Sequence, residues 1–140
     1  MIVMTEISKT YKVMLIINMV ACFVYGVLYA FLWWIWLDVI DNTVMPPFYA
    51  QFFGGFLILA LIWFLRIILQ KMSWEKALYF VEFMLFILCV MLLYETYTIL
   101  FVFKDMSQIA RTNSIVSTSV VSVLLILNLI FYYIEIGKHK

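Results

Sequence analysis

The chain alternates between four long apolar stretches and short polar breaks. The stretches cover residues 13–37, 48–69, 77–100 and 115–134. A helix rises about 1.5 Å per residue, so about 20 apolar residues cross a hydrocarbon core roughly 30 Å thick. The pattern therefore predicts four transmembrane helices. Because the breaks are short, sequential helices become antiparallel neighbours, and the expected fold is an all-α, up-down-up-down bundle.

Composition supports a membrane protein and excludes several classes of partner. Hydrophobic residues make up 68% of the chain, charged residues make up 12%, and the mean hydropathy is +1.13. Soluble domains average about 45–50% apolar and about 25% charged residues. The lipid bilayer is the first expected partner, and residues 1–140 form a single membrane domain. A net charge of only +1, with scattered basic residues, argues against nucleic acid.

The basic residues predict the orientation in the membrane. Seven of the nine flank the N-terminus, the second break and the C-terminus: Lys9, Lys12, Arg66, Lys71, Lys76, Lys138 and Lys140. The first break, 38–47, has none, and the third has only Lys104 and Arg111. Basic residues in short loops stay on the cytoplasmic side, so both termini are expected to be cytoplasmic in this multi-pass protein.

Residues at the breaks indicate where the helices begin. Pro46 and Pro47 lie at the expected start of the second helix, where a missing N–H costs little. Ser73 is expected to cap the third helix, and Glu75 is well placed near its positive dipole end. Residues 1–12 either form an interfacial turn or extend the first helix.

Charged side chains at membrane depth are the best functional candidates, because they are costly there. Arg66 and Glu82 lie at similar distances from the second break. They either form an ion pair between neighbouring helices or reach the cytoplasmic face separately. Both alternatives are structural rather than catalytic.

Glu95 is harder to explain as a residue at the membrane surface, since no basic residue of its own span can reach it. A turn of about 100° per residue leaves it about 140° from Glu82 around the helix, so the two carboxylates cannot form one dyad. We expect Glu95 to face the bundle and accept hydrogen bonds. Its expected partners include the hydroxyl groups of the fourth helix.

The fourth helix carries a stripe of small residues that permits close helix packing. Its members recur at helical spacing: Ser114, Ser117, Thr118 and Ser122. The stripe should face protein, either in a contact with the third helix near Glu95 or in a dimer interface. Gly54 and Gly55 permit a similar close approach on the second helix.

Three uncharged polar residues also lie in the predicted spans. Gln51 is expected to be buried or interfacial. Asn18 and Asn128 fall in the cytoplasmic halves of their helices and are candidates for one polar layer with Arg66 and Glu82. Such a layer either packs the bundle or forms a solute site.

No catalytic residue, metal or cofactor is predicted. Cys22 and Cys89 lie within spans, where free cysteines usually behave as small hydrophobes. His139, the single histidine, is expected to lie in a frayed C-terminus. No phosphate-binding loop, Cys-x-x-Cys pair or nucleophile elbow occurs in the chain.

Three functional classes fit these observations. The first is an interaction or accessory bundle that packs against copies of itself or within a larger membrane complex. The second is a small oligomeric transporter or channel that uses Glu95, or Glu82 with Arg66, in its pathway. The third is an enzyme acting on a lipid or quinone, which lacks an evident acid and base pair. The first class requires the fewest assumptions.

Overall fold

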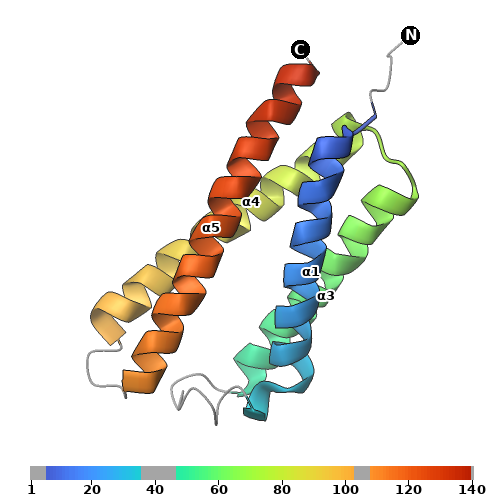
Figure 1. Cartoon of the computed structure of the whole chain (residues 1–140). Helices are drawn as coiled ribbons and strands as arrows, with labels where there is room; N and C mark the ends of the chain where they lie inside the picture. Colours follow the sequence, from blue (N-terminus) through green and yellow to red (C-terminus); the bar gives the residue numbers. More distant parts are fainter. Residues whose placement is uncertain (1–5, 36–46, 103–107, 140) are drawn as a thin grey trace.

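The computed structural model describes residues 6–35, 47–102 and 108–139, and these residues form a helical membrane protein (Figure 1). The elements are α1 (Lys9–Phe31), α3 (Pro47–Leu69), α4 (Trp74–Tyr97), the π-helical turn η1 (Thr98–Val102) and α5 (Gln108–Lys138). No β-strand occurs in these ranges. The β-type backbone pairing there is limited to an isolated antiparallel bridge between Glu6 and Ser73. Four helices are long and apolar enough to span a membrane. The predicted all-α, four-helix fold is confirmed.

The ends of the helices differ from the hydrophobic boundaries. α1 begins at Lys9 because the Ser8 Oγ accepts the backbone N–H of Tyr11 at 3.2 Å and caps the helix. It ends at Phe31, earlier than the predicted residue 37, because Leu32 leaves helical geometry (φ −114°, ψ 23°). α5 extends beyond both ends of its apolar stretch. Helical hydrogen bonding continues through the polar residues at the ends of a helix, whereas hydropathy marks only the segment of the helix that faces lipid.

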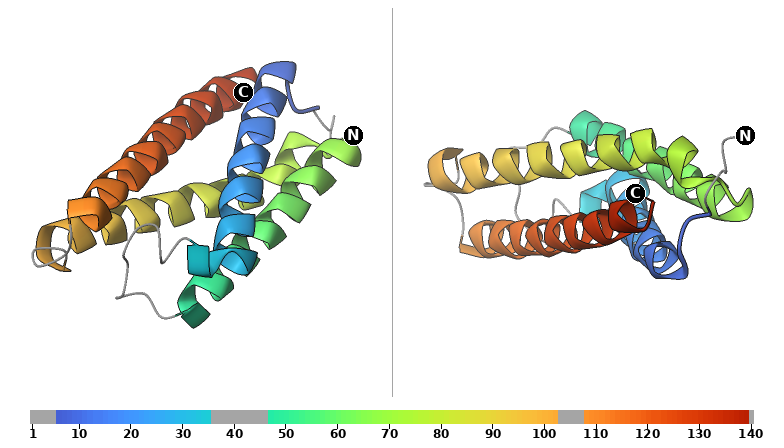
Figure 2. Two further views of the ribbon diagram at one scale, coloured as in Figure 1. Left: turned by 60° about the horizontal axis from the view of Figure 1, so that its bottom comes forward. Right: turned by 90° about the horizontal axis from the view of Figure 1, so that it is seen from above.

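The helices form two antiparallel hairpins. α1 packs along α3, α4 packs along α5, and α1 also contacts α5 (Figures 1 and 2). The start of α1 and the end of α5 lie together, with Lys138 Nζ donating to Ser8 Oγ at 3.1 Å. The α3–α4 turn lies at the same end, where Ser73 bridges Glu6. We call this end of the molecule the terminal end.

The first hairpin contains a very close helix crossing. A Cβ atom at Gly54 would lie 2.8 Å from both Ala30 Cα and the Tyr29 carbonyl carbon of α1. Only glycine leaves room for that backbone contact. A Cβ at Gly55 would meet nothing within 4 Å. Of the two glycines singled out in the sequence, Gly54 therefore permits the close approach and Gly55 does not contribute to it.

The turn between α3 and α4 closes α3 with a Schellman motif. Met72 N donates to Ile67 O at 3.1 Å and Lys71 N donates to Ile68 O at 3.3 Å. Lys71 has a φ of 47°, a left-handed conformation usually taken by glycine. The prediction that the Ser73 side chain caps α4 is wrong. Its carbonyl accepts the N–H groups of Lys76 and Ala77, and its Oγ is buried without a partner among the described residues.

Little of each span is buried against protein. Between 11% and 28% of the most apolar window of each span is buried within the chain. The remaining surface carries large exposed side chains such as Phe23, Phe52 and Phe86. Exposed apolar area on this scale is compatible with lipid as the surrounding medium and not with water. The protein is therefore a small multi-pass membrane protein.

Candidate functional site

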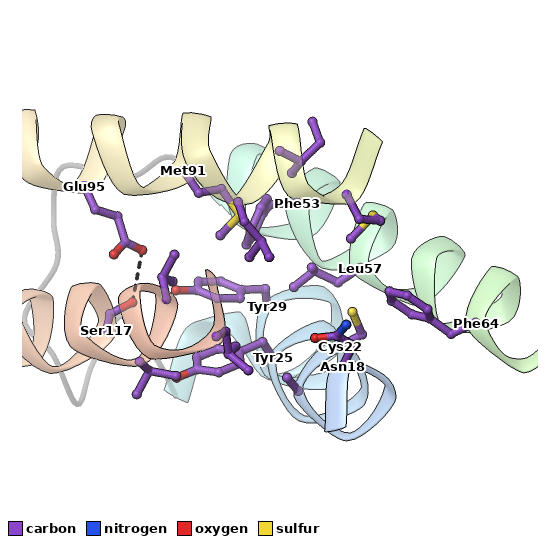
Figure 3. A pocket seen from close by; sticks show the side chains of 17 residues that line it. Asn18, Cys22, Tyr25, Tyr29, Phe53, Leu57, Phe64, Met91, Glu95 and Ser117 are labelled. Carbon is purple, nitrogen blue, oxygen red and sulfur yellow. Dashed lines mark hydrogen bonds between the residues drawn. The ribbon is translucent and has the colours of Figure 1, made fainter. Parts of the chain in front are cut away.

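A cavity of about 70 Å³ lies where the two hairpins meet, and all four long helices contribute to its wall. Figure 3 shows the side chains that surround it. The wall is mostly aliphatic and aromatic, and ten of its side chains are Asn18, Cys22, Tyr25, Tyr29, Phe53, Leu57, Phe64, Met91, Glu95 and Ser117. A single carboxylate therefore lies in a predominantly apolar, membrane-embedded cavity.

Glu95 projects from α4 toward α5 at one side of this cavity (Figure 3). Its Oε1 accepts a hydrogen bond from Ser117 Oγ at 3.1 Å. Its Oε2 is buried and has no hydrogen-bond partner in the part of the chain that the structure describes. Leaving a buried polar atom unsatisfied costs about 1–3 kcal/mol. The structure places Glu95 facing the bundle, as expected, and leaves one acceptor available.

The small-residue stripe of α5 lies beside Glu95. Its four members, Ser114, Ser117, Thr118 and Ser122, are all half-buried. The Ser117 hydroxyl donates to the Glu95 carboxylate at 3.1 Å, and the Thr118 hydroxyl lies close to the same carboxylate. The hydroxyls of Thr118 and Ser122 instead donate to the carbonyls of Ser114 and Thr118, at 2.8 Å and 2.7 Å. Within the chain, the stripe therefore lies in the contact between α4 and α5 near Glu95.

Asn18 and Asn128 form a buried polar pair between α1 and α5. Asn18 Nδ2 donates to Asn128 Oδ1 at 2.7 Å, and Asn128 Nδ2 donates to Asn18 Oδ1 at 2.9 Å. Asn128 Nδ2 also donates to the Leu124 carbonyl at 2.8 Å. Asn18 lines the cavity at the side away from Glu95 (Figure 3). The pair joins the two hairpins and satisfies both amides.

Arg66 and Glu82 do not join this layer or pair with each other. Both side chains are exposed, on faces of α3 and α4 that point away from the cavity. Arg66 Nε donates to Gln70 Oε1 at 3.1 Å, and its guanidinium lies 5.0 Å from the centre of the Trp63 ring. Glu82 accepts a hydrogen bond from the Tyr132 hydroxyl at 2.7 Å. The ion-pair alternative is therefore wrong for the described residues.

Gln51 is also placed differently from one of the expectations. Its side chain is exposed in the first turns of α3, next to Ala50, where the candidate span begins. The expectation of a buried Gln51 is therefore wrong. Its position at the end of the span agrees with the interfacial alternative.

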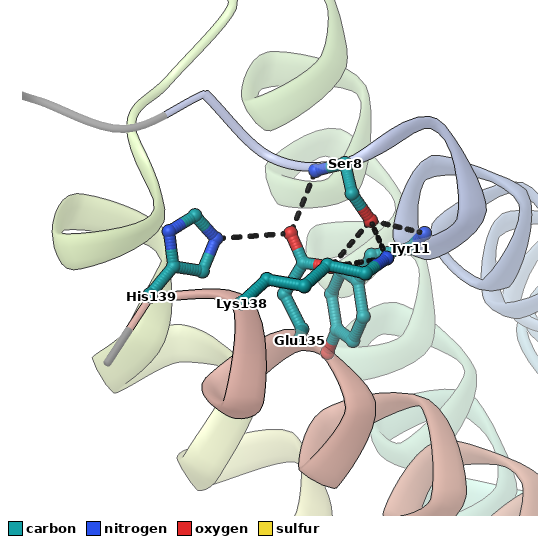
Figure 4. Close-up of polar contacts among 5 residues, drawn as sticks. All are labelled: Ser8, Tyr11, Glu135, Lys138 and His139. Atoms are coloured by element: carbon teal, nitrogen blue, oxygen red, sulfur yellow. Dashed lines mark hydrogen bonds and ion pairs between the residues drawn. The ribbon is translucent and has the colours of Figure 1, made fainter.

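A second polar cluster, which the sequence did not single out, surrounds Glu135 at the terminal end (Figure 4). Glu135 is completely buried. It accepts the Ser8 backbone N–H at 2.6 Å and the Ser8 hydroxyl, and it contacts His139 Nε2 at 3.2 Å. Lys138 Nζ lies 3.7 Å from its Oε2. The carboxylate thereby ties the start of α1 to the end of α5.

His139 is part of this cluster and does not belong to a frayed terminus. Its ring stacks on Trp74 with centroids 5.6 Å apart and an interplanar angle of 9°. Trp74 also meets Tyr11 edge-on at 5.1 Å. The spacing of Lys138 and His139, three and four residues after Glu135, is the sequence signal that indicates this cluster.

The two sites differ in their capacity for further binding. The Glu135 carboxylate already has donors on both oxygens, so its role is structural. The cavity retains the free Oε2 acceptor of Glu95. In the described ranges no group of three His, Cys, Asp or Glu residues is arranged to hold a metal ion. No protein-family model, curated protein or solved structure matches the chain.

Proposed function

We propose that this membrane protein binds a small amphipathic amine in the cavity between its hairpins, with Glu95 as the anchor. The observation that carries the proposal is the buried, unpartnered Oε2 of Glu95 at the wall of that cavity. Among the described residues Glu95 has no basic partner, and a buried intramembrane carboxylate in this state favours a ligand that brings a donor or a positive charge.

The remaining wall of the cavity complements the other parts of such a ligand. Tyr25 and Tyr29 also line the cavity, with their hydroxyl ends toward the side of Glu95 (Figure 3), and their ring faces attract ammonium groups. Aliphatic side chains such as Leu57 and Met91 suit an apolar tail. A volume of about 70 Å³ accommodates an ammonium head with a few methylene groups. A longer tail would leave the cavity and lie in the surrounding lipid.

This proposal favours the transporter or channel class over the interaction or accessory class. The accessory hypothesis stays a prediction, but the small-residue stripe that motivated it lies beside Glu95 within the chain. The cavity has a volume of about 70 Å³, which is the size of a bound head group. Transport would therefore require the hairpins to separate or a second copy to complete the path. Among the described residues, no nucleophile and no pair of acid and base supports the enzyme hypothesis.

Protection of Glu95 from a lipophilic carbodiimide tests the binding site directly. Octylammonium is expected to lower the modification of Glu95 in purified protein about tenfold at about ten times its dissociation constant, by mass action. Octanol, which has the same chain without a charge, should protect much less. Peptide mass spectrometry measures the modification at each carboxylate, and Glu82 on the same helix serves as the exposed control.

Two variants complete the experiment. Octylammonium should raise the thermal stability of the wild type and of Glu82→Gln, and it should have little effect on Glu95→Gln. Equal protection by octanol would show that the cavity binds alkyl chains without regard to charge. Unchanged labelling of Glu95 with every compound would refute the binding function itself.

We also propose that both termini are cytoplasmic, as the distribution of basic residues predicts. The structure supports the shared side, because Ser8 and Lys138 meet at the terminal end. Reporter enzymes that are active only in the cytoplasm should be active when fused to either terminus. A reporter in the first break, after Asp38 or Asp41, should be inactive in the same cells. Opposite activities at the two termini would contradict this topology.

A further inference from the structure

A second pocket lies at the terminal end, beside the turn between α3 and α4. It has a volume of about 510 Å³ and is lined by Glu6, Arg66, Gln70, Lys71, Met72, Ser73 and Lys76. We call it the basic pocket. We propose that the basic pocket binds the phosphate group of an anionic membrane lipid. This inference is independent of the amine cavity, with which it shares no residue.

The charges of the basic pocket favour an anion. Three cationic side chains and one carboxylate line it, which leaves an excess of two positive charges (three minus one). In the part of the chain that the structure describes, none of the three cations is in an ion pair, since both ion pairs there involve Glu135. Two contacts hold Arg66 in place. Its Nε–H donates to Gln70, and its guanidinium lies over the ring of Trp63. Its terminal N–H groups therefore remain available to an oxyanion.

Lys71 is placed at this pocket by the backbone. The Schellman motif that ends α3 holds it at a φ of 47°, with Lys71 N donating to Ile68 O at 3.3 Å. Glycine is the usual residue at that position, because a side chain there is strained. The strain has no packing benefit that the structure shows, since Lys71 is exposed. A positive charge at the pocket is a benefit that glycine could not provide.

Ser73 supplies an independent indication of a ligand. It is only 8% exposed, it lines the pocket, and its Oγ has no partner among the described residues. Its carbonyl, rather than its hydroxyl, accepts the N–H groups of Lys76 and Ala77. The hydroxyl is therefore free to donate to a bound oxygen atom. It also lies immediately before the 24-residue helix α4, whose N-terminal dipole attracts negative charge.

The position of the basic pocket along the membrane normal favours a lipid as the source of the phosphate. The pocket lies between the candidate spans Ala50–Leu69 and Trp74–Phe101, where the chain leaves the hydrocarbon core. Lipid phosphates lie at this level, and basic pockets between helices on the cytoplasmic side bind anionic headgroups. A free phosphate ion would meet the same charges but would lack the apolar chains that α3 and α4 can contact.

Native mass spectrometry of the detergent-purified protein tests the proposal with three probes. These are dihexanoyl phosphatidylglycerol, dihexanoyl phosphatidylcholine and inorganic phosphate. The phosphatidylglycerol should bind the wild type, and it should bind about tenfold more weakly to a protein that carries both Lys71→Gly and Lys76→Gln. Lys71→Gly relieves the strained φ, so this change is not expected to destabilise the turn. A variant with Lys9→Gln and Lys12→Gln removes the same charge elsewhere at the terminal end and should bind normally.

Each result decides a specific part of the proposal. Binding of phosphatidylglycerol without binding of inorganic phosphate identifies a lipid as the ligand. Equal binding of inorganic phosphate would support the phosphate site but overturn the lipid as its source. Equal weakening in the control variant, or equal binding of phosphatidylcholine, would overturn the proposal, since either result indicates attraction without the basic pocket. Absence of binding by all three probes would overturn it as well.

Discussion

Replacing Gly54 by alanine is expected to destabilise the protein by about 3 kcal/mol or more, because the new methyl group would overlap the backbone of α1. Its Cβ would lie 2.8 Å from Ala30 Cα. A backbone atom cannot rotate away as a side chain can, so α1 and α3 must separate along their interface. Unfolding of the purified protein in mixed micelles with increasing sodium dodecyl sulfate, followed by circular dichroism, measures the effect.

Gly55 provides a matched control for this prediction. An added Cβ there would meet nothing within 4 Å, so Gly55→Ala removes only the conformational freedom of glycine. We expect its free energy of unfolding to be unchanged or raised by up to about 1 kcal/mol. Similar losses in the two variants would show that the helices do not cross as closely as the structure indicates.

Replacing Glu135 by alanine is expected to cost about 3 kcal/mol, since it removes the shared acceptor of a buried network. The Ser8 N–H and hydroxyl would lose their partner, Lys138 would lose its counter-charge, and His139 would lose its contact with the carboxylate. The same unfolding titration measures this loss. The start of α1 should also become susceptible to protease under conditions in which the wild type is resistant.

Glu82→Ala is the corresponding control for the Glu135 variant. Glu82 is exposed, and its one hydrogen bond among the described contacts is with Tyr132. Its loss should change the free energy of unfolding by less than about 1 kcal/mol. A wild-type stability for Glu135→Ala would mean that the network around Ser8 contributes nothing to the connection between α1 and α5.

The positions of several features could be predicted from the sequence because they depend on local chemistry. A run of apolar residues such as 48–69 must form a helix in lipid, since every backbone polar group needs an internal partner there. Glu95 could be recognised as unusual for the same reason, since its charge lies at membrane depth. The small residues around Ser117 indicated a surface that another helix could approach. Each of these inferences uses one helix at a time.

Other features could not be predicted because they depend on which faces of the helices meet. Gly54 and Gly55 are neighbours of the same type, and only the rotation of α3 against α1 makes one essential and the other free. Arg66 and Glu82 have a suitable spacing for an ion pair, but their faces turn away from the cavity. The sequence analysis did not single out Glu135, because its donor Ser8 lies 127 residues away in the chain.

The sequence alone determined that this is a four-span, antiparallel membrane protein with most of its basic residues at one end. Those properties follow from transfer of each segment between water and lipid, which does not require knowledge of its neighbours. Only the tertiary structure decided where a cavity forms, which Glu95 oxygen stays unpartnered and which basic residues share a pocket. Helices that are apolar on nearly every side carry little information about their rotation, since lipid and protein interior are almost equally favourable to their side chains.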